Sequence, residues 1–318
     1  MSELTLRNTL PRSPDRLSVF NDSTVSAEWR GYGFGSLAAF IWGCYLAFSS
    51  VGVNAGLDAF DLAFLRYVPA GLVLAPWFLR HDPLRLSGIG WFRGLSLVML
   101  AGPLFVLTGS SGFAFAPLAH SAVIQLGTVT LAGILLSVLM LKERLGIAQV
   151  IGIAAMIAGL AITAGPGLLT GGSQAWKGDL LFIAAGLMWA LFTVLQRRWR
   201  VDPLGATAVV SALSALAYGS TYLILRGPNR ILSIDPLLVA TEVAVLGVLA
   251  GVVALFAFGR AVSLLGAGRA ALFPALSPAV AILAGIPLTG ATPSAGQVAG
   301  LLALTTGLLV AMRRVGAK

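Results

Sequence analysis

The feature that most constrains this chain is a nearly unbroken series of apolar segments, each about 20 residues long, between residues 32 and 313. A helix rises about 1.5 Å per residue, so about 20 residues cross the roughly 30 Å hydrocarbon core of a bilayer. Only 10% of the 318 residues are charged, whereas soluble domains have about 25%. The sequence therefore predicts a polytopic membrane protein whose partner is the lipid bilayer and which has no large soluble domain.

Because the apolar segments are continuous rather than alternating, they favour spanning helices over the strands of a barrel. We predict an all-α integral membrane fold with ten transmembrane helices. A flexible cytoplasmic tail at 1–31, an external linker at 166–177 and a cytoplasmic tail at 314–318 complete the expected chain. The expected helices cover residues 32–53, 59–79, 92–114, 119–140, 146–165, 178–197, 206–225, 237–258, 266–288 and 296–313.

The positive charges predict the orientation of these helices. With both termini in the cytoplasm, seventeen of the 21 Lys and Arg fall on inside loops, tails and helix ends, and three fall outside, namely Lys177, Arg226 and Arg230. Arg66 alone lies well inside a span. Because cytoplasmic loops carry an excess of Lys and Arg, we predict cytoplasmic termini in the inner or plasma membrane of the cell.

Two halves of the chain repeat each other. Trp42 matches Trp189 at an offset of 147, and 120–152 matches 268–300 at an offset of 148. Each half, 32–165 and 178–313, holds five expected spans, and this odd number inverts the second half in the membrane.

The charges follow that inversion. The turn at 142–144 carries Lys, Glu and Arg on the inside, and its counterpart at 290–292 carries no charge on the outside. Inverted repeats can enclose a central site and expose it to either side in turn, which favours a carrier over a membrane enzyme or a simple anchor.

Several stretches, in order and at the right spacing, carry a family resemblance: "FIWGCYLAF", "DLAFLRYVPAGLVL", "FAPLAHSAV", "LKERLGIAQVIGIAAMIAGL", "GDLLFIAAGLMWALFTVLQRR" and "FPALSPAVAILAG". Together they resemble the EamA-type transporters of the drug/metabolite transporter superfamily. The resemblance implies a ten-helix, alternating-access carrier of small organic solutes, often an exporter of amino acids or other metabolites.

The chain departs from the family pattern in two places. It has "LGTVTLAG" where a midway Pro is usual, and Ala291 where a Glu is usual, while Pro274 and Pro278 are kept.

Polar and aromatic side chains at membrane depth are the candidates for solute binding, because polar groups there are costly. Gln125 and Thr128 share one face of the expected fourth helix, and the paired Trp42 and Trp189 lie at mid-span, where they could stack on an aromatic or cationic solute. Packing between helices is the alternative role for all of them. The candidates are Trp42, Tyr45, Thr108, Ser111, Gln125, Thr128, Trp189, Thr193 and Phe258.

Three ionisable residues are candidates for gating or charge handling. Arg66 either binds a carboxylate or steadies the outer gate with Asp61 or Asp58, or else snorkels to the outer interface. His120, in an outer turn, is interpreted as a solvated loop histidine rather than a proton relay. Glu242 falls near a span end, as do the other acidic residues of the spans, so no carboxylate is expected at the midplane.

A proton-driven pump ordinarily needs a titratable group near the midplane. The sequence therefore predicts facilitated diffusion or exchange of metabolites such as amino acids. The alternative is proton-coupled efflux of aromatic or cationic drugs.

Other classes of function find little support in the sequence. The basic residues are spread over short loops, so no nucleic acid partner is expected despite the net charge of +9. Cys44 is the single cysteine, and the two histidines, His81 and His120, fall on opposite sides of the membrane. A membrane enzyme acting on lipids would need clustered catalytic groups, and a channel would need a ring of like groups. We expect a small-molecule solute as partner, no cofactor and no enzymatic activity.

Overall fold

The computed structural model describes residues 16–141, 146–169, 174–265, 273–290 and 292–311, and these residues form ten helical segments without a strand. The first half comprises α1 (Arg16–Asn54), α2 (Ala59–Arg80), α3 (Trp91–Ala101) with α4 (Pro103–Gly112), α5 (Leu118–His120) with η2 (Ser121–Gln125) and α6 (Leu126–Leu141), and α7 (Ile147–Leu169). The second half comprises α8 (Ala175–Arg198), α9 (Pro203–Ser214) with η3 (Ala215–Gly219) and α10 (Ser220–Arg226), α12 (Pro236–Glu242) with η4 (Val243–Val253) and α13 (Ala254–Leu265), η5 (Phe273–Leu276) with α15 (Ser277–Thr289), and α16 (Ala295–Ala311). Short helices η1 (Pro83–Arg85) and α11 (Asn229–Leu232) lie in connections.

The prediction of an all-α fold in two five-helix halves is confirmed. Seven helical segments within the described ranges are long and apolar enough to cross a membrane, and two shorter apolar helices cover Ile147–Gly159 and Ser277–Thr289. Two boundaries differ from the prediction. Helix α1 already begins at Arg16, so residues 16–31 extend the first helix rather than form a tail, and α7 continues to Leu169 into the expected linker. The charged turn at 142–144 and Ala291 lie outside the described residues.

Proline and glycine break the third spanning segment in a defined way. Gly102 has an extended backbone between α3 and α4, and Pro103 opens α4 at the position where its missing N–H costs nothing. The hydroxyl of Tyr67 donates to the carbonyl oxygens of Ala101 and Gly102, at 2.6 and 2.9 Å. A side chain of a neighbouring helix therefore satisfies the carbonyl groups that the break sets free, as breaks at membrane depth require.

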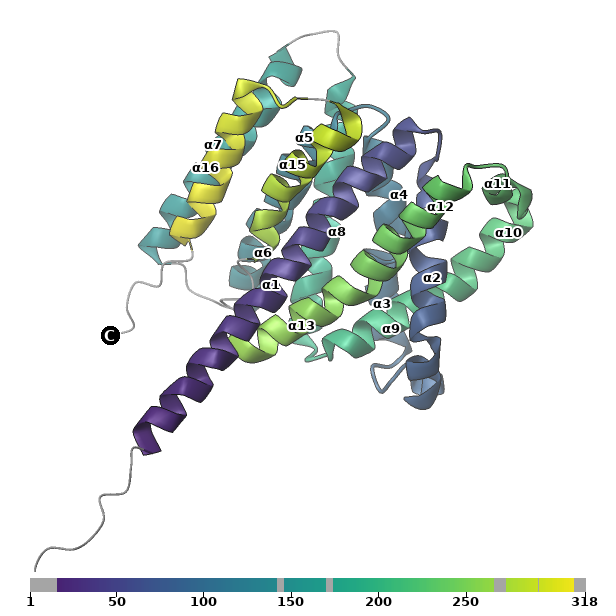
Figure 1. Ribbon diagram of the computed structural model, residues 1–318, viewed down its shortest axis with the longest axis horizontal. Coiled ribbons are helices and arrows are strands. Elements are labelled where there is room, and N and C mark those ends of the chain that lie inside the picture. Colours follow the sequence, from purple (N-terminus) through teal and green to yellow (C-terminus); the bar gives the residue numbers. More distant parts are fainter. Residues whose placement is uncertain (1–15, 142–145, 170–173, 266–272, 291, 312–318) are drawn as a thin grey trace, which may run out of the picture.

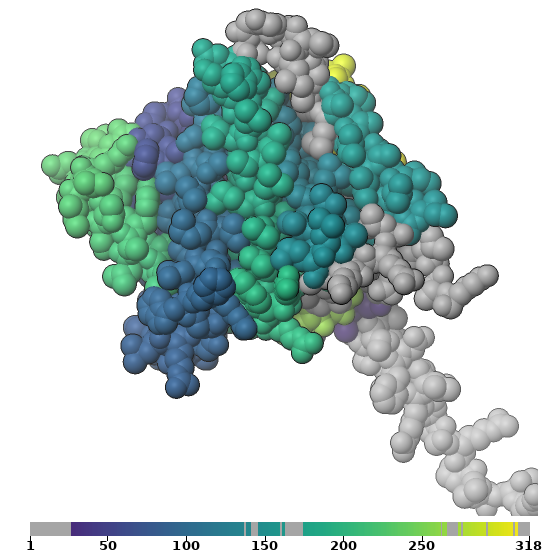
Figure 2. Space-filling model, turned by 180° about the vertical axis from the view of Figure 1, so that it is seen from behind, coloured from purple at the N-terminus to yellow at the C-terminus, as the bar shows by residue number. Residues whose placement is uncertain are grey.

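The two halves interleave rather than stand side by side (Figure 1). Helix α1 packs on α13 and α15, α2 packs on α9 and η4, and α8 packs on α6 and α4. Figure 2 shows the face on which α8 runs between α4 of the first half and the teal α6 and α7. The centre of the molecule is therefore built from both halves.

Helices α7 and α16 form a pair at the edge of the bundle (Figure 1). A Cβ atom on Gly159 would lie 2.6 Å from the carbonyl oxygen of Gly300, and a Cβ atom on Gly307 would lie 2.6 Å from that of Gly152. Gly152 and Gly300, like Gly159 and Gly307, are partners at the repeat offset of 148. Each helix thus offers the same two glycines to the other, which is the reciprocal contact that a two-fold relation between the halves produces.

We call the outer end of the bundle the end at which α1 and α10 finish and α2, α8 and α12 begin, which the charge pattern predicts to face outside. The opposite end is the inner end.

Candidate functional site

Aromatic side chains from both halves meet at the centre of the bundle. The rings of Trp42 and Trp189 lie 6.5 Å apart between centroids, and the ring of Phe258 lies 5.3 Å from that of Trp42. Phe105 and Phe192 extend the group, at 5.1 and 5.3 Å from Trp189. The structure therefore brings together three of the sequence candidates, Trp42, Trp189 and Phe258, and adds two phenylalanines that the sequence pattern did not single out.

Arg66 of α2 is buried beside this aromatic group, with an exposed fraction of 4%. Its guanidinium lies over the ring of Tyr45 at 4.6 Å and near that of Tyr67 at 5.6 Å. Its Nε and Nη1 atoms have no hydrogen-bond partner. The guanidinium is buried against these two tyrosines rather than exposed at the outer interface, and Asp61 and Asp58 form ion pairs with Arg230 and Arg226.

A small cavity of about 20 Å³ adjoins Arg66, enough for a single water molecule. Its walls come from α2, α3, α8, α9, η4 and α13, and therefore from both halves. Beside Arg66 the walls include Tyr67, Trp189, Thr207 and Ser211. The cavity thus combines one buried cation with hydroxyl groups and an aromatic wall.

The hydroxyl candidates of the sequence lie away from this cavity. Thr108 donates to the carbonyl of Leu104 at 2.8 Å, and Thr193 donates to that of Trp189 at 2.9 Å, each one turn back on its own helix. Such back-bonding satisfies a threonine hydroxyl locally. Ser111 is half-buried near the end of α4 and is likewise absent from the walls.

Gln125 and Thr128 pack between helices. The buried Gln125 amide lies against Gly109 of α4, and Thr128 lies against Gly186 of α8. These contacts match the packing role that the sequence left open for both residues.

His120 corrects a prediction. It is buried, and its Nδ1 lies 2.8 Å from Oδ1 of Asp179 on α8. The solvated loop histidine expected from sequence is therefore wrong. The physical reason is that α5 begins at Leu118, directly after Pro117, so the histidine lies in a helical turn against α8 rather than in a loop.

Glu242 ends α12 and is fully buried, with an exposed fraction of 0%. Neither carboxylate oxygen has a hydrogen-bond partner. The side chain lies against α1, where a Cβ atom on Gly52 would approach Oε1 to 2.8 Å. Its place near the end of a span does not make it solvated, because a neighbouring helix covers it, and the absence of a carboxylate at the midplane stays a prediction. A usable signal was that Glu242 is the one acidic residue in the sequence of the 30-residue segment Pro236–Leu265.

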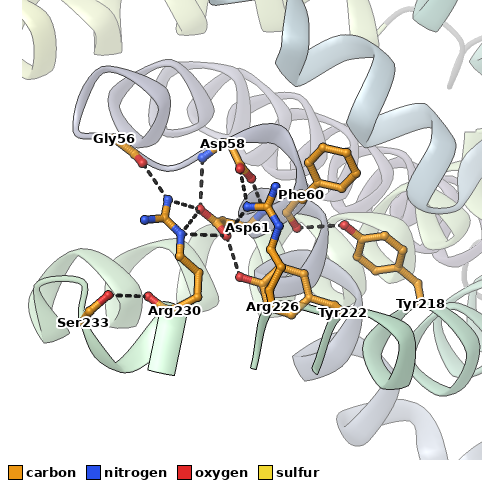
Figure 3. Close-up of polar contacts among 9 residues, drawn as sticks. All are labelled: Gly56, Asp58, Phe60, Asp61, Tyr218, Tyr222, Arg226, Arg230 and Ser233. Atoms are coloured by element: carbon orange, nitrogen blue, oxygen red, sulfur yellow. Dashed lines mark hydrogen bonds and ion pairs between the residues drawn. The ribbon is translucent and has the colours of Figure 1, made fainter. Parts of the chain in front are cut away.

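A polar cluster at the outer end ties α2 to α10 and α11 (Figure 3). The buried Asp61 accepts from Tyr222 Oη at 2.5 Å and from Arg230 Nη2 at 2.6 Å. Asp58 pairs with Arg226 at the more exposed edge of the cluster. The hydrogen bond with Asp61 raises the pKa of the Arg230 guanidinium, which keeps it charged. From the sequence, Arg226 and Arg230 are predicted only to be outside charges, and nothing in it marks their pairing with α2.

A second cavity of about 520 Å³ opens at the outer end, within the range of small-molecule sites. It lies between the end of α1, the segment 113–119, the end of α15 and the start of α16. Among the described wall residues are Ser50, Asn54, Thr289 and Gln297, and none of the described walls carries a charge.

Comparison with known proteins now adds to this geometry. The model of the EamA-like transporter family matches residues 29–165 and again residues 176–313. This chain belongs to the EamA-like transporter family. The two matches coincide with the two structural halves, so each five-helix half is one EamA unit and the protein is a membrane transporter.

Structural comparison finds the same fold in a solved structure. A solved structure titled only "Crystal structure of protein" superposes with a TM-score of 0.61 at 20% sequence identity, covering 92% of this chain and 99% of that chain. At this identity the likeness shows the shared fold alone. Comparison with curated proteins gave no match.

Proposed function

We propose that this EamA protein is an alternating-access carrier that exports small organic metabolites, such as amino acids, from the cell, with both termini in the cytoplasm and no enzymatic activity. The observation that carries the proposal is the small central cavity, whose walls come from both inverted halves. Inverted halves around a central site are the arrangement in which one half rocks against the other and exposes the site to each side in turn.

The chemistry of the cavity supports an amphipathic cargo with a carboxylate. Arg66 is the cation at the wall, Trp189 and Phe192 supply apolar area, and Ser211 and Thr207 supply hydroxyl groups. An arginine fork matches a carboxylate with two parallel hydrogen bonds. A metabolite that carries a carboxylate and an apolar side chain fits these groups better than a purely cationic drug.

For coupling we propose facilitated diffusion or exchange. A second candidate is proton-coupled efflux of aromatic or cationic drugs, and one observation favours it: Glu242 is buried without a partner. A buried carboxylate can hold a proton in one state and release it in another. The two candidates differ in whether transport needs a pH gradient.

Counterflow in proteoliposomes tests the proposal. Vesicles preloaded with one unlabelled amino acid per batch receive the labelled form outside, without a pH or voltage gradient. Transient accumulation of label is expected for at least one amino acid. Accumulation that occurs only after a pH gradient is imposed favours the proton-coupled candidate, and no accumulation under either condition refutes the proposed cargo.

A further inference from the structure

Two buried ionisable side chains in the described spanning helices carry atoms without the hydrogen-bond partners that such atoms normally have. Asp61 pairs with Arg230, and His120 hydrogen-bonds with Asp179. By contrast, Nε and Nη1 of Arg66 and both carboxylate oxygens of Glu242 have no hydrogen-bond partner. Arg66 has an exposed fraction of 4% and Glu242 of 0%, so water does not replace the missing partners.

An unpartnered charge at this depth is unfavourable, and proteins that keep one usually use it. The two charges have opposite sign and come from opposite halves of the transporter, Arg66 from α2 and Glu242 from α12. A ligand that offers one negative and one positive group would satisfy both at once. The two groups do not bond to each other through Nε or Nη1 of Arg66, since these atoms and both Glu242 oxygens have no hydrogen-bond partner.

One face of α1 connects the two charges. Tyr45, Ser49 and Gly52 are spaced i, i+4 and i+7, so they share that face. The Arg66 guanidinium lies over the Tyr45 ring, and the Glu242 carboxylate lies at Gly52. Ser49 lies between them on α1, and its side chain is buried.

Gly52 shows that α1 is fitted to the carboxylate. A Cβ atom at this position would approach Oε1 of Glu242 to 2.8 Å, closer than real Cβ contacts allow. The backbone of α1 therefore approaches the Glu242 side chain at a point where a larger residue would displace it. Together the face of α1, Arg66 and Glu242 form a line of buried polar groups: guanidinium, hydroxyl and carboxyl.

We propose that Arg66 and Glu242 are the two charge receptors for a zwitterionic solute, Arg66 for its carboxylate and Glu242 for its ammonium group, with the Ser49 hydroxyl between them. This inference rests on the proposed carrier function and names its substrate class. The planar fork of Arg66 suits a carboxylate, and the Glu242 oxygens accept from an ammonium group. Closure of the two halves on the solute brings both receptors to it.

Binding to the purified protein tests the inference without requiring transport. Quenching or enhancement of tryptophan fluorescence reports occupancy, because Trp189 lines the cavity beside Arg66. The probes are the proteinogenic L-amino acids and, for the tightest binder, its methyl ester, which lacks the carboxylate, and its N-acetyl derivative, which lacks the ammonium group. We expect the zwitterion to bind at least about tenfold more tightly than either derivative, since each derivative leaves one buried charge unsatisfied.

Variants assign each charge to its receptor. Arg66→Gln should weaken zwitterion binding about tenfold or more and leave the ester unaffected within about twofold. Glu242→Gln should weaken the zwitterion similarly and leave the N-acetyl derivative unaffected. Arg93→Gln and Asp82→Asn remove charges from outside the site and should change neither affinity. If a Gln variant does not fold, Arg66→Lys and Glu242→Asp keep the charge and should weaken binding while preserving the preference for the zwitterion.

Three results would overturn the inference. They are the failure of every amino acid to bind the wild type, a derivative that binds as tightly as the zwitterion, and Gln variants with unchanged affinity. Counterflow of a singly charged or neutral solute would leave the carrier function standing and refute the zwitterion site. Zwitterion binding that depends on both charges, but without counterflow, would support the zwitterion site and refute the carrier function.

Discussion

The outer polar cluster allows a quantitative prediction, because it contains two aspartates of different burial on the same turn of α2. Asp61 has an exposed side-chain fraction of 0%, and its partner Arg230 has 35%. Asp58 has 42%, and its partner Arg226 has 33%. The substitutions Asp61→Asn and Asp58→Asn each remove one charge and preserve the shape of the side chain.

The expected effects follow from these fractions. Breaking a fully buried ion pair costs about 3–5 kcal/mol, but Arg230 is one-third exposed and regains some water, so we expect Asp61→Asn to lower the free energy of unfolding by about 2–3 kcal/mol. Exposed pairs contribute about 0–1 kcal/mol. The amide oxygen that Asp58→Asn introduces would still accept from the backbone N–H of Asp61, as the Asp58 carboxylate does at 2.9 Å. We therefore expect at most about 1 kcal/mol for Asp58→Asn.

Denaturant titration in mixed micelles, followed by tryptophan fluorescence, measures both variants against the wild type. Added salt should shrink the effect of Asp58→Asn and leave most of that of Asp61→Asn, because buried pairs are screened less. Equal losses in the two variants, or a loss below about 0.5 kcal/mol for Asp61→Asn, would show that burial does not set the strength of these pairs.

Two further predictions concern the helix pair at the edge and the orientation. Gly307→Ala should lower the thermal midpoint of unfolding, because the added Cβ atom would lie 2.6 Å from the backbone of the opposing helix. In the control variant Gly133→Ala the Cβ atom has nothing within 4 Å, so the midpoint should stay the same or rise through better helix propensity. Equal shifts in the two variants would contradict the close approach of α7 and α16. For the orientation, single cysteines are introduced in a Cys44→Ser background and treated with a membrane-impermeant maleimide on intact cells. The reagent should label Asn229→Cys directly and Arg85→Cys only after the cells are permeabilised. The opposite labelling pattern would show that the orientation is the reverse of the predicted one.

Much of the fold could be predicted from sequence because the bilayer acts on every segment alike. The length of each apolar segment predicts a spanning helix. The different placement of Lys and Arg in matching turns of the two halves predicts that the second half is inverted. The repeat offset of 148 even marked Gly152 and Gly300, which prove to be contact points of α7 and α16. Boundaries were less accurate, since the polar residues 16–31 continue α1 although they lack the apolar character of a span.

The site was harder to predict, because burial of a polar group depends on residues far away in the chain. His120 and Asp179 are 59 residues apart, so the sequence around one residue does not show that the other is its partner. Glu242 was placed near a span end, but the neighbour that encloses it, Gly52, comes from the other half. Distance from a helix end measures depth in the membrane and says little about whether a neighbouring helix covers the side chain.

The two-fold relation between the halves holds where helices touch and fails where charges lie. Gly159 and Gly307 make equivalent contacts across the α7–α16 pair. The positions 147 residues from Arg66 and Glu242, however, are Leu213 and Leu95, so neither charge has a counterpart. A carrier needs similar backbones in its two halves to exchange conformations, but a solute with unlike ends needs unlike receptors. The lone Arg66 in one half and the lone Glu242 in the other are therefore the arrangement that an inverted repeat would need to hold a zwitterion in a single orientation.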